Sequence, residues 1–306
     1  MRNAKAMKNI LIITSSYDKT IDYIIEKFSS TKFIRLNVDE LDKYKISIIS
    51  NPRYIVSLKS SEYEIDNLFE SIHSIYYRKL FLPNLDNYDK NYHTYMQKEI
   101  YSFIVGLVDS FQGKVLTRPS ILRKVENKIF QLKVSIDLGF LLPNSLITND
   151  NTQANKFNVS KIIAKPLSTG KLTNTTAIHS NLITENVEDI ALTPIYFQEY
   201  IKKDYELRIT VIKDVFYCVK IIADNKIDWR EGEDNNLYEL IDTPEIVKQE
   251  CLDFLRACGL EFGAFDYIVS DGKYYFLECN PNGQWLWLEL KLGLDISKSI
   301  VEYLND

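Results

Sequence analysis

Strand-sized apolar runs and amphipathic stretches alternate along the first third of the chain. The strand-sized runs lie at 8–14, 32–36 and 75–78. Residues 21–28 have the spacing of a helix, and a longer helical pattern covers 92–112 and ends at Gly113. The turn after the first strand contains no glycine, so the dinucleotide-binding fingerprint is absent. This order predicts an N-terminal α/β unit that is a scaffold or binds substrate.

A further helical pattern follows a boundary that we expect near Thr117. The apolar stripe of this helix, which should face the core, consists of Val125, Ile129, Leu132 and Ile136. Gly139 is placed to cap its C-terminus. Residues 151–158 predict a polar loop. Three strands are expected around this loop and beyond it, at 161–165, 175–179 and 195–201.

Two hairpins and two helices are predicted in the last third of the chain. The hairpin strands lie at 206–212, 215–222, 264–269 and 274–279. The helices cover 244–258, stopping at Gly259, and 296–304. Trp285 and Trp287 alternate on a short extended segment, and at least one of them should pack in the core. With no internal repeat, this order predicts a mixed α/β (α+β) protein.

Charge is spread unevenly over the chain. The 306 residues carry a net charge of −5, which argues against a nucleic-acid-binding protein that works through a basic surface. No apolar run approaches the roughly 20 residues of a membrane span. Residues 120–175, however, contain eight Lys and Arg and only three Asp and Glu. This segment is either a solvated basic surface or an anion site suited to a polyphosphate.

None of the four cysteines forms a Cys-x-x-Cys pair, and each lies among apolar residues. We therefore expect the cysteines to be small side chains of the core, in a protein of the reducing cytoplasm. Their spacing argues against a zinc site or a disulfide framework. The three histidines are scattered, so a bound cation should be held by carboxylates. Met7 lies just before the first strand, and residues 1–6 are therefore expected to be a tail or an upstream start.

Polar residues interrupt the last two apolar strands. Asp266 lies in the first of them, and Glu278 and Asn280 share a face of the second because strand side chains alternate. We predict a three-residue loop, 270–272, with its glycine in the left-handed region. This loop places Asp266 opposite Phe276 and diagonal to Glu278, roughly 7–8 Å away, a gap that a metal ion can bridge.

Two carboxylates and an amide oxygen are hard ligands, which suit Mg²⁺ or Mn²⁺ shared with substrate phosphates. The alternative is a group of polar residues on an edge strand that face water. Ionised side chains among apolar neighbours need a cation or strong partners. The metal site formed by Asp266, Glu278 and Asn280 is therefore the favoured interpretation.

From about residue 118 to residue 306, the order and spacing of these residues resemble an ATP-grasp ligase. In that superfamily a helix lysine and a lid-strand lysine reach the nucleotide phosphates, and Lys128 and Lys165 resemble this pair. The segment with Gln198, Glu199 and Ile201 resembles the superfamily strand that contacts adenine. Glu206, seven residues after Glu199, resembles the acid that binds the ribose hydroxyls. The trio of Asp266, Glu278 and Asn280 resembles the metal ligands of the superfamily.

The resemblance implies an ATP-grasp fold that uses ATP and Mg²⁺, or Mn²⁺. An N-terminal α/β pre-ATP-grasp domain is expected at 1–117, a central lid domain at 118–197, and a C-terminal antiparallel-sheet domain with the metal site at 198–306. The lid loop after Lys165 contains a single glycine, where many members have a glycine-rich loop. Side chains that would substitute for the missing backbone contacts are Ser168, Thr169 or Lys171.

Four stretches narrow the resemblance further. They are Tyr76-Tyr77-Arg78-Lys79, residues 117–128, Asp228-Trp229-Arg230 and residues 280–289. They are similar to the graspetide ligases, the microviridin-type macrocyclases. This likeness implies that Asp or Glu side chains of a ribosomal precursor peptide are activated by ATP as acyl phosphates and joined to Ser or Thr (ester) or Lys (amide). The implied partners are the leader and core of that peptide, with the leader on the hairpin region 202–230, and a homodimer; neither nucleic acid nor membrane is expected.

Arg208 and Arg230 are the candidates to stabilise the acyl phosphate, because a guanidinium matches a carboxylate or phosphate with two hydrogen bonds. Glu206 and Arg208 share a strand face. The alternative for both arginines is a surface ion pair. Asn282 and Gln284 either contact the acceptor peptide or belong to a turn.

Two rival functions stay open. One is an ATP-grasp ligase that adds an amino acid to a small molecule or a protein tail, which would use the same nucleotide residues. The other is a non-catalytic nucleotide-binding module. The intact metal trio and both lysines argue against this module, because a degenerate binder has no need to retain them.

Overall fold

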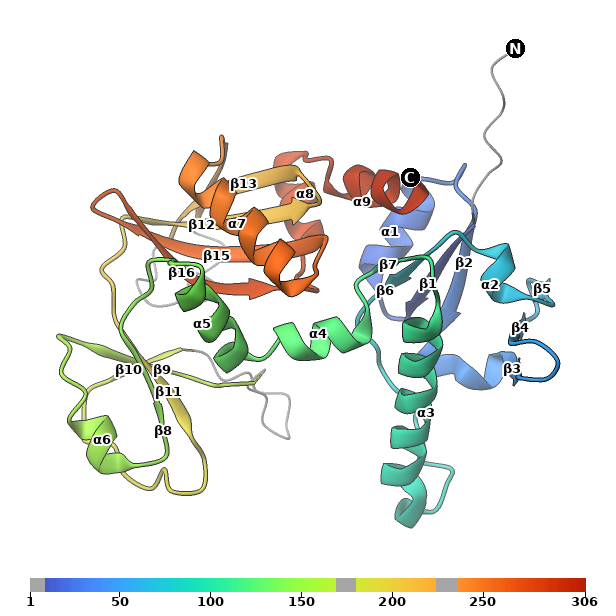
Figure 1. Cartoon of the computed structure of the whole chain (residues 1–306), viewed down its shortest axis with the longest axis horizontal. Helices are drawn as coiled ribbons and strands as arrows, with labels where there is room; N and C mark the ends of the chain where they lie inside the picture. The colour runs from blue at the N-terminus through green and yellow to red at the C-terminus, as the bar shows by residue number, and fades with distance from the viewer. Residues whose placement is uncertain (1–8, 169–179, 224–235) are drawn as a thin grey trace. The chain divides into compact units, whose positions relative to one another are not determined.

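The computed structural model describes residues 9–168, 180–223 and 236–306. The chain divides into two compact units, Met1–Leu122 with Asp295–Asp306, and Arg123–Leu294 (Figure 1). The strand expected at 175–179 lies outside the described residues.

A parallel sheet in the order β2-β1-β6-β7 forms the core of the first unit. Its strands are β1 (Ile10–Thr14), β2 (Phe33–Asn37), β6 (Ser74–Tyr77) and β7 (Lys114–Leu116). All of β1 is buried, as is usual for a central strand of a parallel sheet. The unit also contains α1 (Lys19–Lys27), α3 (Lys90–Ser110) and α9 (Ile296–Asn305). The predicted N-terminal α/β unit is confirmed.

The C-terminal helix α9 packs on the N-terminal sheet. Ser74 Oγ donates to the carbonyl of Leu304 at 2.8 Å, and Lys114 Nζ donates to the carbonyl of Tyr303 at 2.7 Å. The last residues of the chain are therefore part of the first compact unit. The three-domain division that the sequence suggests, with boundaries at 117 and 197, stays a prediction.

A buried ion pair lies where β1 and β6 end. The fully buried Arg78 places its Nε 3.3 Å from Asp18 Oδ2, and the same oxygen accepts from Thr14 Oγ1 at 2.7 Å. Burial raises the pKa of Asp18, but the charge of Arg78 and the hydrogen bonds outweigh it and hold that pKa below its ordinary value. The pair therefore stabilises the folded state only while Asp18 is ionised.

Asp18→Asn should lower the free energy of unfolding at pH 7 by about 3–5 kcal/mol, because it leaves the buried Arg78 guanidinium without a counter-charge. The pKa of Asp18 is lowered by folding, so its contribution is present above the unfolded pKa of about 3.9 and is lost as the pH falls through the folded pKa. Urea unfolding of both proteins between pH 7 and pH 3 measures the difference. A difference that does not shrink towards pH 3 would contradict this account.

The sequence does not predict a second, antiparallel sheet in the first unit. It consists of β3 (Lys45–Ile49), β4 (Ile55–Lys59) and β5 (Glu64–Ile65), flanked by the 3₁₀ helix η1 (Val38–Lys43) and the short helix α2 (Leu68–Ser71). Within these three strands, Val56 and Leu58 are the fully buried side chains. The sequences KISII and IVSLK of β3 and β4 are nonetheless rich in β-branched residues, so they do carry a strand signal that the prediction leaves out.

The smaller of two antiparallel sheets in the second unit has the order β10-β9-β11-β8. Its strands are β8 (Ser145–Thr148), β9 (Ile162–Lys165), β10 (Asn181–Ile183) and β11 (Ile195–Glu199). The polar loop expected at 151–158 is wrong, because α6 (Asn151–Asn155) occupies most of it. The Asp150 side chain accepts from the backbone N–H groups of Thr152 and Gln153, and this N-cap favours a short helix even in a polar segment.

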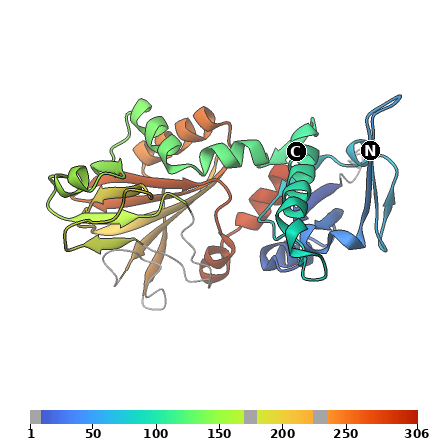
Figure 2. The ribbon, with the colours of Figure 1, turned by 90° about the horizontal axis from the view of Figure 1, so that it is seen from below.

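The larger sheet has the order β14-β13-β12-β15-β16. Its strands are β12 (Tyr205–Ile212), β13 (Val215–Ile222), β14 (Leu237–Ile241), β15 (Phe262–Ser270) and β16 (Lys273–Asn280). Helices α5 (Lys128–Asp137) and α7 (Glu245–Cys258) lie on one face of it (Figures 1 and 2). Ring contacts of Phe254 with Phe265 and Phe276 join α7 to the sheet. Both predicted hairpins are confirmed.

The apolar stripe predicted at 125–136 is buried only in part. Val125 is fully buried and Leu132 is half-buried, but Ile129 and Ile136 are 51% and 57% exposed, whereas Gln131 and Ser135 face the core. The predicted single helix is wrong, because the pattern spans two helices, α4 (Pro119–Val125) and α5, which begins after its N-cap Asn127. The break between the helices changes the phase of the pattern along α5. Gly139 has the expected left-handed conformation, with φ of 77°.

Trp285 is fully buried, which confirms that one tryptophan of the pair packs in the core. The extended segment predicted there is wrong, because Trp287 lies in α8 (Leu286–Leu292). Two alternating positions are too few to separate a strand from the start of a helix. All four cysteines are buried and free, as their apolar neighbours predict. Across the described residues, no helix has the length and apolar character needed to cross a membrane.

Candidate active site

The hairpin between β15 and β16 turns in two residues, not three. Ser270 pairs with Lys273, which leaves Asp271 and Gly272 in the turn with φ of 49° and 71°. Positive φ at both positions is typical of a type I′ turn. The predicted three-residue loop is therefore wrong, although Gly272 has the expected left-handed conformation.

A β-bulge brings the predicted metal ligands to one face in spite of this turn. Tyr267 pairs with Phe276, but Asp266 pairs with Glu278, which makes Leu277 an extra residue on β16. The bulge shifts the register by one residue and so offsets the shorter turn. Asp266 and Glu278 are direct cross-strand neighbours, closer than the diagonal pair that the sequence predicts.

Asp266, Glu278 and Asn280 meet at one end of this strand pair. Asn280 Nδ2 lies 3.2 Å from Asp266 Oδ2 and 3.4 Å from Glu278 Oε1. A rotation of the Asn280 amide about its last side-chain bond would turn Oδ1 instead of Nδ2 towards the two carboxylates. The three side chains would then present oxygen atoms of the kind that Mg²⁺ or Mn²⁺ binds. Among the described residues, no group of three or more His, Cys, Asp or Glu could hold a metal ion.

Arg208 pairs with Asp266 across β12 and β15. Its Nη1 donates to both carboxylate oxygens, at 3.0 and 2.9 Å, and the two side chains are each 6% exposed. Its Nη2 donates to the carbonyl of Gln284 at 3.2 Å. Gln284 directly follows a turn, residues 280–283, in which the Gly283 N–H donates to the Asn280 carbonyl at 3.1 Å. Arg208 therefore holds both Asp266 and the residue that follows the turn containing Asn282.

Lys128 lies beside Glu278. It is the first residue of α5, and its N-cap Asn127 accepts from the backbone N–H groups of Ile129 and Phe130 at 3.0 and 3.1 Å. Lys128 Nζ donates to the carbonyl of Pro166 at 2.8 Å and lies 3.8 Å from Glu278 Oε2. Both side chains are partly exposed, at 22% and 26%. The helix lysine and one of the predicted metal ligands are thus neighbours.

Lys165 on β9 reaches the same region through a polar chain. Its Nζ donates to Gln198 Oε1. Gln198 Nε2 in turn donates to the Tyr196 hydroxyl at 3.2 Å and to Ser145 Oγ at 3.3 Å. Burial raises the pKa of Tyr196, and the carboxylate of Glu278 contributes to the same direction. The tyrosine therefore stays protonated at neutral pH.

The residues predicted to bind adenine and ribose lie at the end of β11 and on β12. The Glu199 N–H donates to the Asn144 carbonyl at 2.8 Å, and Asn144 Nδ2 donates to the Glu199 carboxylate at 2.7 Å. Ile201, just beyond β11, is half-buried. Glu206 is buried and accepts from Lys203 Nζ, with which it forms an ion pair. Their roles towards a nucleotide stay predictions.

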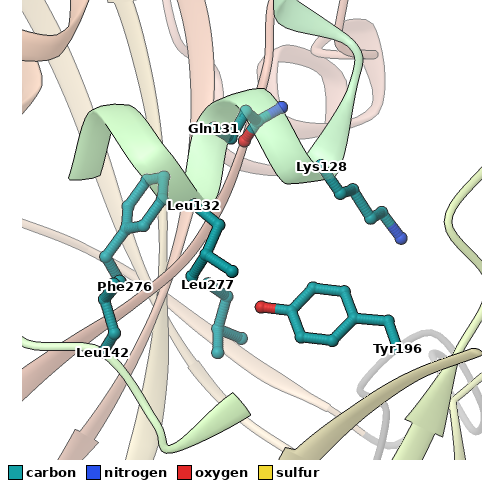
Figure 3. A pocket seen from close by; sticks show the side chains of 7 residues that line it. All are labelled: Lys128, Gln131, Leu132, Leu142, Tyr196, Phe276 and Leu277. Atoms are coloured by element: carbon teal, nitrogen blue, oxygen red, sulfur yellow. The ribbon is translucent and has the colours of Figure 1, made fainter. Parts of the chain in front are cut away.

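A small hollow lies next to Lys128 and Tyr196. It is lined by Lys128, Gln131, Leu132, Leu142, Tyr196, Phe276 and Leu277. In Figure 3, Lys128 and Tyr196 lie on one side of it and Leu142 and Phe276 on the other. The hollow is thus polar on one side and apolar on the other.

Several predicted residues lie outside the described part of the chain. They are Thr169, Lys171, Asp228, Trp229 and Arg230. The sequence also misses three residues of the site that the structure describes, which are Gln131, Ser145 and Tyr196. Tyr196 carries a usable signal, since it precedes Gln198 by two residues and shares its strand face. Neither Gln131 nor Ser145 carries such a signal.

Comparisons with known proteins agree with this geometry. Residues 9–122 match the family model of the MvdD pre-ATP grasp domain. A RiPP-associated ATP-grasp ligase from Chryseobacterium gregarium, solved with ADP and a leader and core peptide, is 28% identical with a TM-score of 0.89, over 97% of this chain and 96% of its own. The macrocyclase MdnC from Microcystis aeruginosa, bound with the precursor peptide MdnA, is 26% identical with a TM-score of 0.87, over 97% and 99%. No curated protein matches by sequence. The expected resemblance and fold are confirmed.

Proposed function

We propose that this chain, an ATP-grasp ligase that resembles RiPP macrocyclases, uses ATP to form macrocycles in a ribosomal precursor peptide. The observation that carries the proposal is the meeting of Lys128 with Glu278, 3.8 Å apart, beside Asp266 and Asn280. A cationic side chain next to a set of hard oxygen ligands suits a nucleotide polyphosphate with its cation.

In the proposed reaction an Asp or Glu carboxylate of the peptide attacks the γ-phosphorus of ATP. The bond to the β-phosphate oxygen breaks, and ADP leaves an acyl phosphate behind. A Ser or Thr hydroxyl, or a Lys amine, then attacks the carbonyl carbon and displaces phosphate, which gives an ester or an amide. Each ring removes the elements of one water from the peptide. Such a transfer depends mainly on positioning and charge neutralisation.

Different residues of the chain perform the separate tasks of this reaction. Mg²⁺ bound by Asp266, Glu278 and Asn280 would neutralise phosphate charge. Lys128 and Lys165 orient the phosphates from the helix and from the lid strand. The nucleoside is recognised by Gln198, Glu199, Ile201 and Glu206. Arg208 and Arg230 stabilise the charge on the acyl phosphate, and Arg208 also fixes Asp266.

Arg230→Ala should lower the turnover number by about 10²–10³-fold if its guanidinium meets the developing charge. The rate of peptide-dependent ADP release at saturating ATP and peptide measures this. An unchanged turnover number would remove Arg230 from the mechanism.

The remaining features of the proposal follow from the same resemblance. The proposed partners are the leader and core of the precursor peptide, since similar proteins have been solved with such peptides. From the resemblance of the sequence alone, the leader is placed on the hairpin region 202–230 and the chain is proposed to form a homodimer. The domains are 1–117, 118–197 and 198–306. A cytoplasmic location is supported by the four free, buried cysteines, which need no oxidising compartment.

Mg²⁺-dependent ADP release tests the proposal against its two rivals. The substrate is a short peptide rich in Ser, Thr, Lys, Asp and Glu that is encoded beside this protein. Macrocyclisation predicts that the peptide stimulates release. Nucleotide binding without release would support a non-catalytic module. Release that requires a second small molecule, with a gain in mass of the acceptor, would support ligation of an amino acid.

A further inference from the structure

Gln131 joins α5 to β16 through its side-chain amide. Oε1 accepts from the backbone N–H of Cys279 at 2.8 Å, and Nε2 donates to the carbonyl of the same residue at 2.8 Å. Nε2 also donates to the carbonyl of Val125, at 2.8 Å, at the end of α4. The side chain is 5% exposed. Both ends of one buried amide are therefore used.

Gln131 binds two peptide groups, one on each side of Cys279 and therefore next to residues of the proposed metal site. Cys279 separates Glu278 from Asn280, and β16 is the edge strand of its sheet, paired on its other side with β15. The amide of Gln131 occupies the place where a further strand would pair. It prevents the loss of stability that an unpaired, buried N–H and C=O would cause. It also fixes the position of β16 between the two ligands.

The same helix carries Lys128. Lys128 and Gln131 are three residues apart, so they lie on the same face of α5. The contact of Gln131 with Cys279 therefore sets the position of α5 along β16, and with it the 3.8 Å distance between Lys128 Nζ and Glu278 Oε2. A displacement of about 1 Å between reacting or binding groups can lower a rate 10²-fold.

We infer that Gln131 is a positioning residue, which holds the phosphate-binding Lys128 in register with the metal ligands Glu278 and Asn280. The inference rests on the proposed function, since it concerns the same nucleotide site. The chemistry is specific: the amide supplies one acceptor to the N–H and one donor to the C=O of Cys279, whereas Met supplies neither and Asn is one methylene shorter.

The test compares Gln131→Met with Ser135→Ala in the full chain. Ser135 lies one turn further along the same buried face of α5, and its hydroxyl has no hydrogen-bond partner in the described residues, so it is a matched control. Calorimetric titration with Mg·ADP measures affinity, and urea unfolding measures stability. Gln131→Met should raise the Kd of Mg·ADP at least tenfold, and Ser135→Ala should leave it within twofold. In the ADP-release assay, Gln131→Met should lower kcat and leave the KM for the peptide unchanged.

A folded Gln131→Met variant that binds Mg·ADP like the wild type would overturn the inference. Should this variant fail to fold, Gln131→Asn serves, because it retains both polar groups at a shorter reach. Its Kd should then lie at least threefold above that of the wild type, and an unchanged Kd would again overturn the inference. A folded wild type that does not bind Mg·ADP would instead contradict the proposed function.

Discussion

Glu278→Gln should lower the rate of peptide-dependent ADP release by about 10²–10³-fold. The substitution keeps the shape of the side chain but removes one of the two carboxylates that face Asn280. It also removes the negative charge 3.8 Å from Lys128 Nζ. A loss of about 3–4 kcal/mol of transition-state stabilisation corresponds to this change in rate. Steady-state kinetics over a range of Mg²⁺ concentrations measures it.

Asp271→Asn is the matched control for this variant. It makes the same chemical change in the same hairpin, at a turn position with φ of 49° that asparagine tolerates. Its rate should equal that of the wild type. If Glu278→Gln retained wild-type activity at every Mg²⁺ concentration, Glu278 would not be a metal ligand.

Lys128→Met should raise the Kd of Mg·ATP and reduce turnover, together by about 10²-fold in kcat/KM for ATP. Its ammonium is held between the Pro166 carbonyl and Glu278, in a partly buried position where water screens its charge only in part. Methionine keeps the length and the apolar stem of the side chain and removes the charge. The initial rate of ADP release as a function of ATP concentration measures the effect.

Lys133→Met controls for a loss of positive charge on the same helix. Lys133 is 70% exposed and pairs with Asp137 one turn further on, so its removal should cost little. Equal rates for Lys128→Met and the wild type would exclude Lys128 from the phosphate site. An equal loss in both variants would mean that only the general field of the basic segment matters.

The meeting of three polar side chains on β15 and β16 could be predicted from the sequence, because polar side chains inside apolar strands need a specific partner. Asp266, Glu278 and Asn280 are brought together as predicted, although by a different path. The two-residue turn alone would place Asp266 on the wrong face, and the bulge at Leu277 restores it. The length of the turn and the presence of a bulge each shift the pairing register by one residue. The pattern of polar and apolar positions predicts only the combined shift, not which of the two produces it.

The buried face of α5 could not be predicted in the same way. Periodicity assumes one continuous helix, but the chain breaks before Asn127, and the break rotates the pattern. Gln131 and Ser135 are then buried, and Ile129 is exposed. Gln131 is buried because the edge strand β16 presents the N–H and C=O of Cys279 there, a requirement that comes from the sheet and leaves no trace in the helix sequence.

The contact between Lys165 and Gln198 could be predicted from the sequence only in part. Both strands are predictable from their apolar residues, and both residues were expected at the nucleotide site. The register that brings them together pairs Tyr196 with Lys165, and it is set by the packing of the small sheet as a whole. This register also adds Tyr196 to the site, which the sequence alone does not place there.

The central claim is tested most directly by the intact mass of the precursor peptide after incubation with this protein, ATP and Mg²⁺. The account predicts the loss of one or more water masses, with an equal number of ADP molecules formed, and no loss with Glu278→Gln. An unchanged peptide mass despite ADP release, or a gain in mass, would contradict macrocyclisation.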